Sequence, residues 1–407
     1  MTKDQSARSG RFSPNRRQFL LGGAVAGVGA AAAVGADYVL NRPPAEPIAA
    51  PLNGDATVPF HGEHQGGIDT PPQAHAAFVA LDLQPQVDRD GLRRLMSILT
   101  DDAARLTQGD AALADSEPEL ALVPARLTVT FGFGPGFVAR AAADRTPAWL
   151  RALPAFGIDR LQPAYSDGDL LLQIAADDEL TVAHATRMLL KDTRSFADVR
   201  WIQNGFRRAY GSQPTGTTMR NLFGQVDGTT NPPLGSDEFA ATVWSDQGWL
   251  TGGTGMVIRR ISMDLDKWDR LDRVGREQSV GRNLANGAPL TGKNEHDEPD
   301  FGATTPIGFP VIPAISHVAR ARGDDANEKI FRRGYNYDER PTADQISNSG
   351  LLFVSFQADV DRQFVPIQRR LDQLDILNEW TTPIGSAVFA IPPGCDEGGF
   401  IGEGILA

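Results

Sequence analysis

The sequence is poor in the residues that build compact metal and disulfide sites. Cys395 is the only cysteine among 407 residues, so internal disulfides and zinc or iron–sulfur sites with several cysteine ligands are excluded. Histidine occurs only six times. The formal net charge of -12 and the pI near 5.0 disfavour binding to phosphate backbones or anionic lipid. Because 41% of the residues are hydrophobic, the chain can bury full cores, and its stability must come from packing.

Positive charge is concentrated at the N-terminus. Residues 1–36 hold five basic residues against one acid, so the net charge falls from -12 to -16 without them. The pair Arg16-Arg17, followed by an apolar run of small residues, resembles a twin-arginine export signal with a cleavage site at 34–36. We expect a signal peptide at 1–36 and a periplasmic, extracellular or envelope-associated protein; the alternative is a retained membrane anchor. This route exports folded proteins, which suits a chain that receives a cofactor before export.

The first half of the mature chain alternates strand and helix patterns. The expected elements are strands at 76–82, 127–133, 170–175 and 199–202, and helices at 92–106 and 179–191. Their order is βαββαβ, which is that of a ferredoxin-like unit with both helices on one face of an antiparallel sheet.

The second half carries the same parts with a long interruption. The expected elements are strands at 255–264, 351–358 and 386–391, and helices from 265 and at 361–377. The interruption at about 276–348 has little apolar periodicity, and insertions of this kind usually build a site. The sequence therefore predicts an α+β protein of two ferredoxin-like βαββαβ domains with antiparallel sheets, at 61–211 and 212–407, after a Pro-rich linker at 37–60.

His317 is the best candidate for a metal ligand. It follows the apolar run 307–315 and precedes a charged stretch, as a ligand at the end of a buried element would. A zinc site before the first strand is disfavoured, because the histidine spacing there does not place two imidazoles on one face. The remaining histidines are more simply explained as ordinary loop, surface or core residues: His61, His64, His75, His184 and His296.

Two other segments place charged residues where a buried site would need them. Asp227 lies at a tight turn within Gly224-Gln225-Val226-Asp227-Gly228, which is a weak signal by itself. Arg332 and Arg333 follow His317 by 15 and 16 residues and lie among apolar and aromatic neighbours. Arginines in such surroundings are often partly buried and then need an anionic partner or ligand.

Seven segments form a pattern through their order along the chain: 64–68, the GxxDG motif at 224–228, 281–290, 317–320, 330–337, 351–357 and 391–394. Together they resemble the dye-decolourising-type haem peroxidases, and in particular the exported branch that includes the deferrochelatase/peroxidase proteins. The resemblance covers nearly the whole mature chain. It implies one haem b, bound by the C-terminal ferredoxin-like domain.

The resemblance also implies a role for each candidate residue. His317 would be the proximal ligand of the haem iron, Asp227 the distal acid–base and Arg332 the distal arginine. Arg282 would contact a haem propionate. Four further residues would contact the haem: Gly228, Arg333, Phe353 and Phe356.

The sequence does not identify two side chains next to this site, namely a carboxylate that binds His317 and an amide near the peroxide. A carboxylate bonded to the second nitrogen of His317 would make the imidazole more basic, and Asp324, Asp325 and Glu328 are candidates. Because Gly334 follows the arginine pair, an amide side chain near the peroxide would have to come from elsewhere.

The implied activity is the reduction of hydrogen peroxide through an oxoferryl intermediate, with oxidation of bulky dye-like aromatic or other one-electron donors. The alternative is a deferrochelatase that releases iron from haem, or ferrous iron oxidation, beside an iron-uptake permease. A third class, a haem carrier or a chlorite-decomposing relative, does not need Asp227 together with Arg332. No nucleic acid partner is expected, and a homo-oligomer stays open.

An aspartate base predicts an acidic optimum for donor oxidation. Aspartate side chains ionise near about 4 and histidines near about 6.5, so an aspartate stays charged in acid where a histidine would be protonated. Steady-state rates measured across the pH range should peak below neutrality. A peak well above pH 7 would contradict an aspartate as the base.

Overall fold

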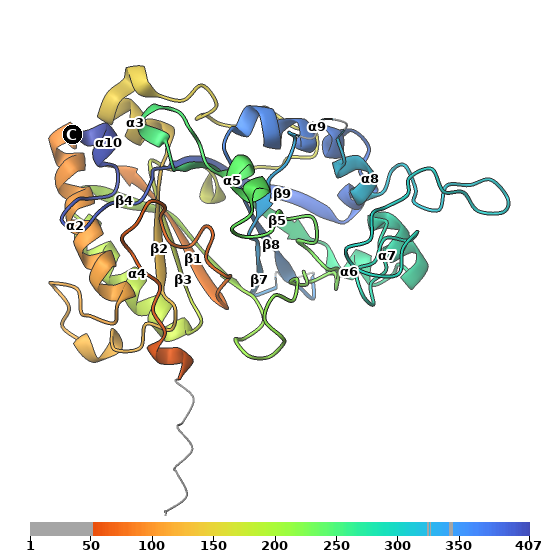
Figure 1. Cartoon of the computed structure of the whole chain (residues 1–407), viewed down its shortest axis with the longest axis horizontal. Helices are drawn as coiled ribbons and strands as arrows, with labels where there is room; N and C mark the ends of the chain where they lie inside the picture. The colour runs from red at the N-terminus through yellow and green to blue at the C-terminus, as the bar shows by residue number, and fades with distance from the viewer. Residues whose placement is uncertain (1–51, 324, 326, 342–344) are drawn as a thin grey trace, which may run out of the picture. The chain divides into compact units, whose positions relative to one another are not determined.

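Nine strands build the fold within residues 52–323, 325, 327–341 and 345–407, which are those that the computed structural model describes (Figure 1). Contacts divide the chain into Met1–Pro51 and Leu52–Ala407, and the fold is that of the second unit. The predicted signal peptide and the first part of the predicted linker lie outside the described residues. Phe60, which the sequence assigned to the linker, is buried in a core.

The first half of this unit has the predicted βαββαβ order with one additional helix, α3. Its elements are β1 (His75–Leu83), α2 (Arg89–Thr107), β2 (Thr128–Phe133), α3 (Pro135–Ala142), β3 (Leu170–Ala176), α4 (Glu179–Thr193) and β4 (Ala197–Phe206). The strands pair antiparallel in the order β2-β3-β1-β4, which is the ferredoxin-like arrangement. Asp88 caps α2 by accepting a hydrogen bond from the backbone N–H of Gly91.

The second half repeats the arrangement around a long insertion. Its elements are α5 (Asp237–Val243), β5 (Thr254–Met263), α6 (Leu265–Trp268), α7 (Arg273–Val280), α8 (His317–Ala321), β6 (Phe331–Arg332), β7 (Tyr335–Glu339), β8 (Asn348–Gln357), α9 (Val365–Leu374), β9 (Thr381–Ile391) and α10 (Glu403–Leu406). The antiparallel order β9-β5-β8-β7 matches that of the first sheet, and β6 pairs beside β7 on β8. The predicted duplication is therefore present in the strand order.

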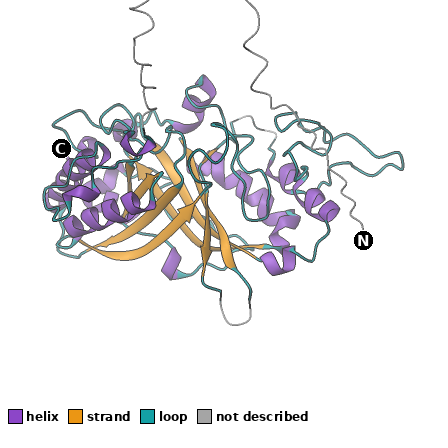
Figure 2. Ribbon diagram, turned by 90° about the horizontal axis from the view of Figure 1, so that it is seen from below, coloured by secondary structure: helices purple, strands orange, loops and turns teal. Residues whose placement is uncertain are grey.

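The two sheets meet at both edges and enclose a core. Phe133 of β2 pairs with Ala390 of β9, and Phe206 of β4 pairs with Asn336 of β7. Alternate residues of both sheets, such as Phe78 of β1, fill the space between them. Figure 2 shows the strands between two groups of helices. Both faces of a strand such as β1 are buried, which explains its nearly continuous apolar sequence.

The boundaries of two predicted elements were wrong in ways that affect the site. The sequence predicts a helix at 361–377, whereas α9 ends at Leu374, so that Asp375 lies beyond the helix. The predicted insertion at 276–348 contains β6 and β7, which the sequence did not predict as strands. These strands are two and five residues long, too short for a clear alternating pattern.

None of the helices in the described part of the chain is both long enough and apolar enough to cross a membrane.

Asp192 on α4 makes the stability of the fold pH-dependent. Burial raises the pKa of Asp192 to about 7, and the Asp102 carboxylate on α2 adds to this effect. A carboxyl group with a raised folded-state pKa stabilises the fold most at low pH, and this contribution is lost as the pH rises towards 7.

Asp192→Asn should therefore stabilise the protein more at pH 8 than at pH 5, by about 1–2 kcal/mol after allowance for the proton shared with Asp102. Urea unfolding at both pH values measures the difference. Asp198→Asn, which makes the same change at an exposed position, is the matched control. An equal effect of Asp192→Asn at pH 5 and pH 8 would contradict the raised pKa.

Candidate active site

His317 is the first residue of α8 and is held by a carboxylate from a distant part of the chain. Its Nδ1 lies 2.6 Å from Oδ2 of Asp375. The Asp375 side chain is only 3% exposed, and its other oxygen accepts a hydrogen bond from the backbone N–H of Leu377. Since the carboxylate can only accept, Nδ1 of His317 carries a proton, and in the neutral imidazole Nε2 is left as the lone-pair donor.

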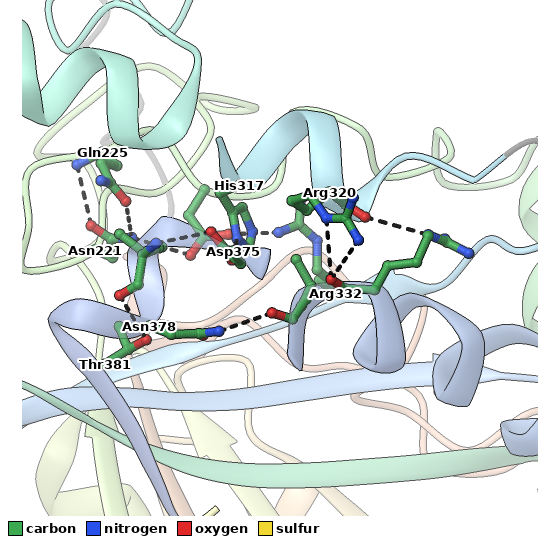
Figure 3. Close-up of polar contacts among 12 residues, drawn as sticks. Asn221, Gln225, His317, Arg320, Arg332, Asp375, Asn378 and Thr381 are labelled. Carbon is green, nitrogen blue, oxygen red and sulfur yellow. Dashed lines mark hydrogen bonds and ion pairs between the residues drawn. The ribbon is translucent and has the colours of Figure 1, made fainter. Parts of the chain in front are cut away.

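The surroundings of His317 explain its electrostatics. Burial lowers the pKa of His317, but the charge and hydrogen bond of Asp375 raise it, so the net pKa is above the usual histidine value. The positive charge of Arg332 lowers this pKa, and the negative charge of Asp227 raises it. The charges of both predicted catalytic residues therefore act on His317. Figure 3 shows His317, Asp375 and Arg332 in this group.

Asp375 replaces the carboxylates that the sequence offered as partners of His317. Asp325 accepts hydrogen bonds from Asn327, and Glu328 pairs with Arg370, so neither orients His317. Asp324 lies outside the described residues. The signal that could have indicated Asp375 is an aspartate at the C-terminal end of a predicted helix, where the helix dipole disfavours negative charge unless a partner is present.

Asp227 and Arg332 form an ion pair, with 2.9 Å between Oδ1 and Nη1. Their side chains are 19% and 23% exposed, respectively. The second oxygen of Asp227 accepts a hydrogen bond of 3.4 Å from Nδ2 of Asn221, and Nη2 of Arg332 donates to Thr230 over 3.4 Å. The sequence had placed these two residues in one site without indicating that they touch.

Asn221 supplies the amide that the sequence could not locate. Its Oδ1 accepts hydrogen bonds from the backbone N–H groups of Phe223 and Gln225, so its NH₂ group must point towards Asp227 and the Gln225 side chain. Figure 3 shows the Asn221 and Gln225 side chains directed towards each other. The residue was missed because it lies outside the GxxDG pattern, three residues before Gly224.

Three other predicted residues lie where they could hold a cofactor. Arg282 donates from Nη1 to the carbonyl oxygens of Gly287 and Glu295, each at 2.8 Å. Burial and the charge of Arg332 lower the pKa of Arg282. Glu295 also accepts a hydrogen bond from Thr229, two residues after Asp227, which connects Arg282 to the same site. Gly228 has φ of +126°, a conformation that side chains rarely adopt, directly after Asp227. Phe353 is half-buried on β8.

The structure contradicts the predicted positions of Arg333 and Phe356. Arg333 is 1% exposed and donates to the carbonyl of Thr70 and, over 2.6 Å, to Oε1 of Gln73. Phe356 is completely buried in the core between the two sheets. Successive strand residues point to opposite faces, so Arg333 lies opposite Arg332, and Phe356 lies opposite Phe353. Neither lines the space around His317.

The donor set fits an iron porphyrin better than a bare metal ion. No group of three or more metal-ligating side chains occurs in the described ranges, so a metal there would need most of its ligands from a cofactor. The His317 side chain is 32% exposed, whereas the side chain of its partner Asp375 is 3% exposed. One imidazole with a carboxylate partner is the protein ligand that a haem iron requires.

Comparison with known proteins agrees with this geometry. Two family models match, "Dyp-type peroxidase, N-terminal" at residues 65–207 and "Dyp-type peroxidase, C-terminal" at 218–396. The chain is 36% identical to a dye-decolorizing peroxidase of Thermobifida fusca (strain YX), with all of both chains covered. It is 35% identical to a deferrochelatase of Shigella sonnei (strain Ss046), with 98% of both covered.

A solved structure extends the similarity. The crystal structure of a DyP-type peroxidase from Cellulomonas bogoriensis is 55% identical, with a TM-score of 0.85 over 88% of this chain and 99% of that one. The chain belongs to the Dyp-type peroxidase family. Membership confirms the resemblance seen in the sequence, the ferredoxin-like fold and the assignment as a peroxidase.

Gly281 allows α8, and with it His317, to pack against the end of α7. Its φ is +88°, and an added Cβ would overlap Cγ1 of Val318. Gly308 is a matched control, because its φ is +89° and no described atom lies within 4 Å of a Cβ placed there.

Both Gly281→Ala and Gly308→Ala should lose about 1 kcal/mol through backbone strain. Gly281→Ala should lose about 1–3 kcal/mol more, because α8 must move away from α7. Urea unfolding measures both free energies. Equal losses in the two variants would show that the contact with Val318 does not constrain α8.

Proposed function

We propose that this chain is a haem b peroxidase in which His317 holds the iron and Asp227 and Arg332 activate hydrogen peroxide. The observation that carries the proposal is the contact of 2.9 Å between Asp227 and Arg332, whose charges both act on His317. A carrier of haem would have no use for a base and a cation joined in this way. The family relationship supports the same activity.

The residues around the site divide the chemistry between them. Bound haem supplies a redox-active iron. Asp227 would take a proton from one oxygen of hydrogen peroxide on its carboxylate and return it to the other oxygen. Arg332 stabilises the negative charge that develops on the leaving oxygen. Asp375 keeps the proton on Nδ1 of His317, so Nε2 stays a basic, oriented ligand.

Deferrochelatase activity is the second candidate, and the observation that favours it is the identity of 35% to the Shigella sonnei protein over nearly the whole chain. Ferrous iron oxidation beside an uptake permease belongs to the same class. Two assays discriminate between the candidates: incubation with haem and a reductant, and incubation of the haem-loaded protein with peroxide and an electron donor. Release of iron with intact porphyrin would favour the deferrochelatase, whereas consumption of peroxide with donor oxidation supports the peroxidase.

Single substitutions should distinguish the role of His317 in haem binding from the role of Asp227 in the reaction with peroxide. His317→Ala should abolish haem retention, because it removes the expected protein ligand of the iron. Asp227→Ala should keep the Soret band and slow the reaction with peroxide by about 100-fold or more, since general acid–base catalysis contributes on the order of 10²–10⁴-fold. Absorption spectra and stopped-flow mixing with peroxide measure the two effects. A wild-type protein without a Soret band after reconstitution with haem would defeat the proposal.

The N-terminal sequence supports export by the twin-arginine route, with function outside the cytoplasm. Residues 1–36 lie outside the described residues, so the support is Arg16-Arg17 and the apolar run after it. Replacement of both arginines by lysine should retain the protein in the cytoplasm, as measured by fractionation with activity staining. Normal export of this variant would exclude the route.

A further inference from the structure

Asn231 binds both backbone polar groups of Arg332. Its Nδ2 donates to the carbonyl oxygen of Arg332 over 2.7 Å, and its Oδ1 accepts from the N–H of Arg332 over 2.9 Å. The two residues are 101 positions apart in the sequence. A pair of short hydrogen bonds to a single residue fixes position and orientation together.

The position of β6 in the sheet explains why Arg332 needs this partner. β6 pairs antiparallel with β8 through Phe331 with Phe356 and Arg332 with Ser355, and the N–H of Arg333 donates to Val354 over 2.9 Å. In such a ladder alternate residues direct their N–H and C=O away from the neighbouring strand. The N–H and C=O of Arg332 both point away from β8, and the Asn231 side chain makes the two hydrogen bonds that a further strand would otherwise make.

Asn231 also belongs to the segment that carries Asp227. Its own N–H donates to the carbonyl of Gly228 over 3.0 Å, which closes a turn directly after Asp227. The N–H of Asp227 donates to the carbonyl of Met219 over 2.8 Å, which anchors the other end. One short segment therefore holds Asp227 by its own backbone and Arg332 through the Asn231 amide.

The ion pair alone would define this geometry poorly. It is a single contact of 2.9 Å at the end of the long arginine side chain, which can reach one oxygen atom from several backbone positions. We propose that Asn231 is a positioning residue of the peroxidase reaction, which fixes the Arg332 backbone so that its guanidinium meets Asp227. The inference rests on the proposed function.

The chemistry of the amide makes the inference specific. Asparagine offers one donor and one acceptor side by side, as a peptide group does. Leucine has nearly the same shape and offers neither. Ionised aspartate keeps the acceptor for the Arg332 N–H, but it cannot donate to the carbonyl and places a negative charge beside it. Asn231→Leu and Asn231→Asp thus remove two bonds and one bond, respectively.

The test compares these variants with Arg332→Leu and with the double variant Asn231→Leu/Arg332→Leu, all loaded with haem. The haem content is measured from the Soret band, the reaction with peroxide by stopped flow, and the affinity for fluoride by titration. Fluoride binding to ferric haem reports on the cation near the bound anion and is independent of turnover. Asn53→Leu is the matched control, because Asn53 is a half-buried asparagine with a long-range bond of 3.0 Å to Asp177, far from Arg332 in the sequence.

We expect Asn231→Leu to retain haem, to slow the peroxide reaction by about 10- to 100-fold and to weaken fluoride binding in parallel. Asn231→Asp should show smaller losses of the same kind. The losses should largely disappear in the Arg332→Leu background, since residues that act through one group are not additive. Asn53→Leu should leave both measurements unchanged.

Two results would overturn the inference. The first is an effect of Asn231→Leu that adds in full to that of Arg332→Leu, because Asn231 would then act independently of the arginine. The second is unchanged fluoride affinity in both Asn231 variants. Failure of the proposed function is distinct, because wild-type protein would then not react with peroxide at all. If Asn231→Leu does not fold, the comparison of Asn231→Asp with Asn231→Asp/Arg332→Leu carries the same test.

Discussion

The hydrogen bond between His317 and Asp375 is the contact on which the candidate site depends. It joins the end of the long insertion to the loop after α9, across 58 positions of sequence. Because Asp375 is itself held by the N–H of Leu377, the imidazole is fixed in both tautomer and direction. The charges of Asp227 and Arg332 both act on this imidazole, so the orientation of His317 sets its position relative to the ion pair.

A second constraint is the alternation of side chains along β6 and β8. It directs Arg332 into the site and Arg333 into contact with Thr70 and Gln73. It also directs Phe356 into the core between the sheets, away from Phe353. Adjacent residues of one motif therefore have different roles: Arg332 pairs with Asp227 at the site, and Arg333 connects the two halves of the fold. This division accounts for both wrong assignments among the predicted cofactor contacts.

The remainder of the site is built by polar contacts between segments without regular structure. Oε1 of Glu295, in the insertion, accepts hydrogen bonds from Thr218 over 2.6 Å and Thr229 over 3.0 Å, on either side of Asp227. The backbone of Glu295 in turn binds Arg282. The prediction that the aperiodic insertion builds a site agrees with this arrangement. A site of this kind needs the two sheets as a rigid base, because its own segments bury little apolar surface.

The sequence by itself determined the order of the main elements, the duplicated unit, the family, and the residues His317, Asp227 and Arg332 as candidates. These follow from local periodicity and from short motifs, which are properties of neighbouring residues. Only the tertiary structure decided that Asp375 orients His317, that Asn221 and Asn231 hold the ion pair, and that Arg333 and Phe356 face away from it. Each of these depends on contacts between distant segments or on the register of a very short strand, and no local pattern encodes either.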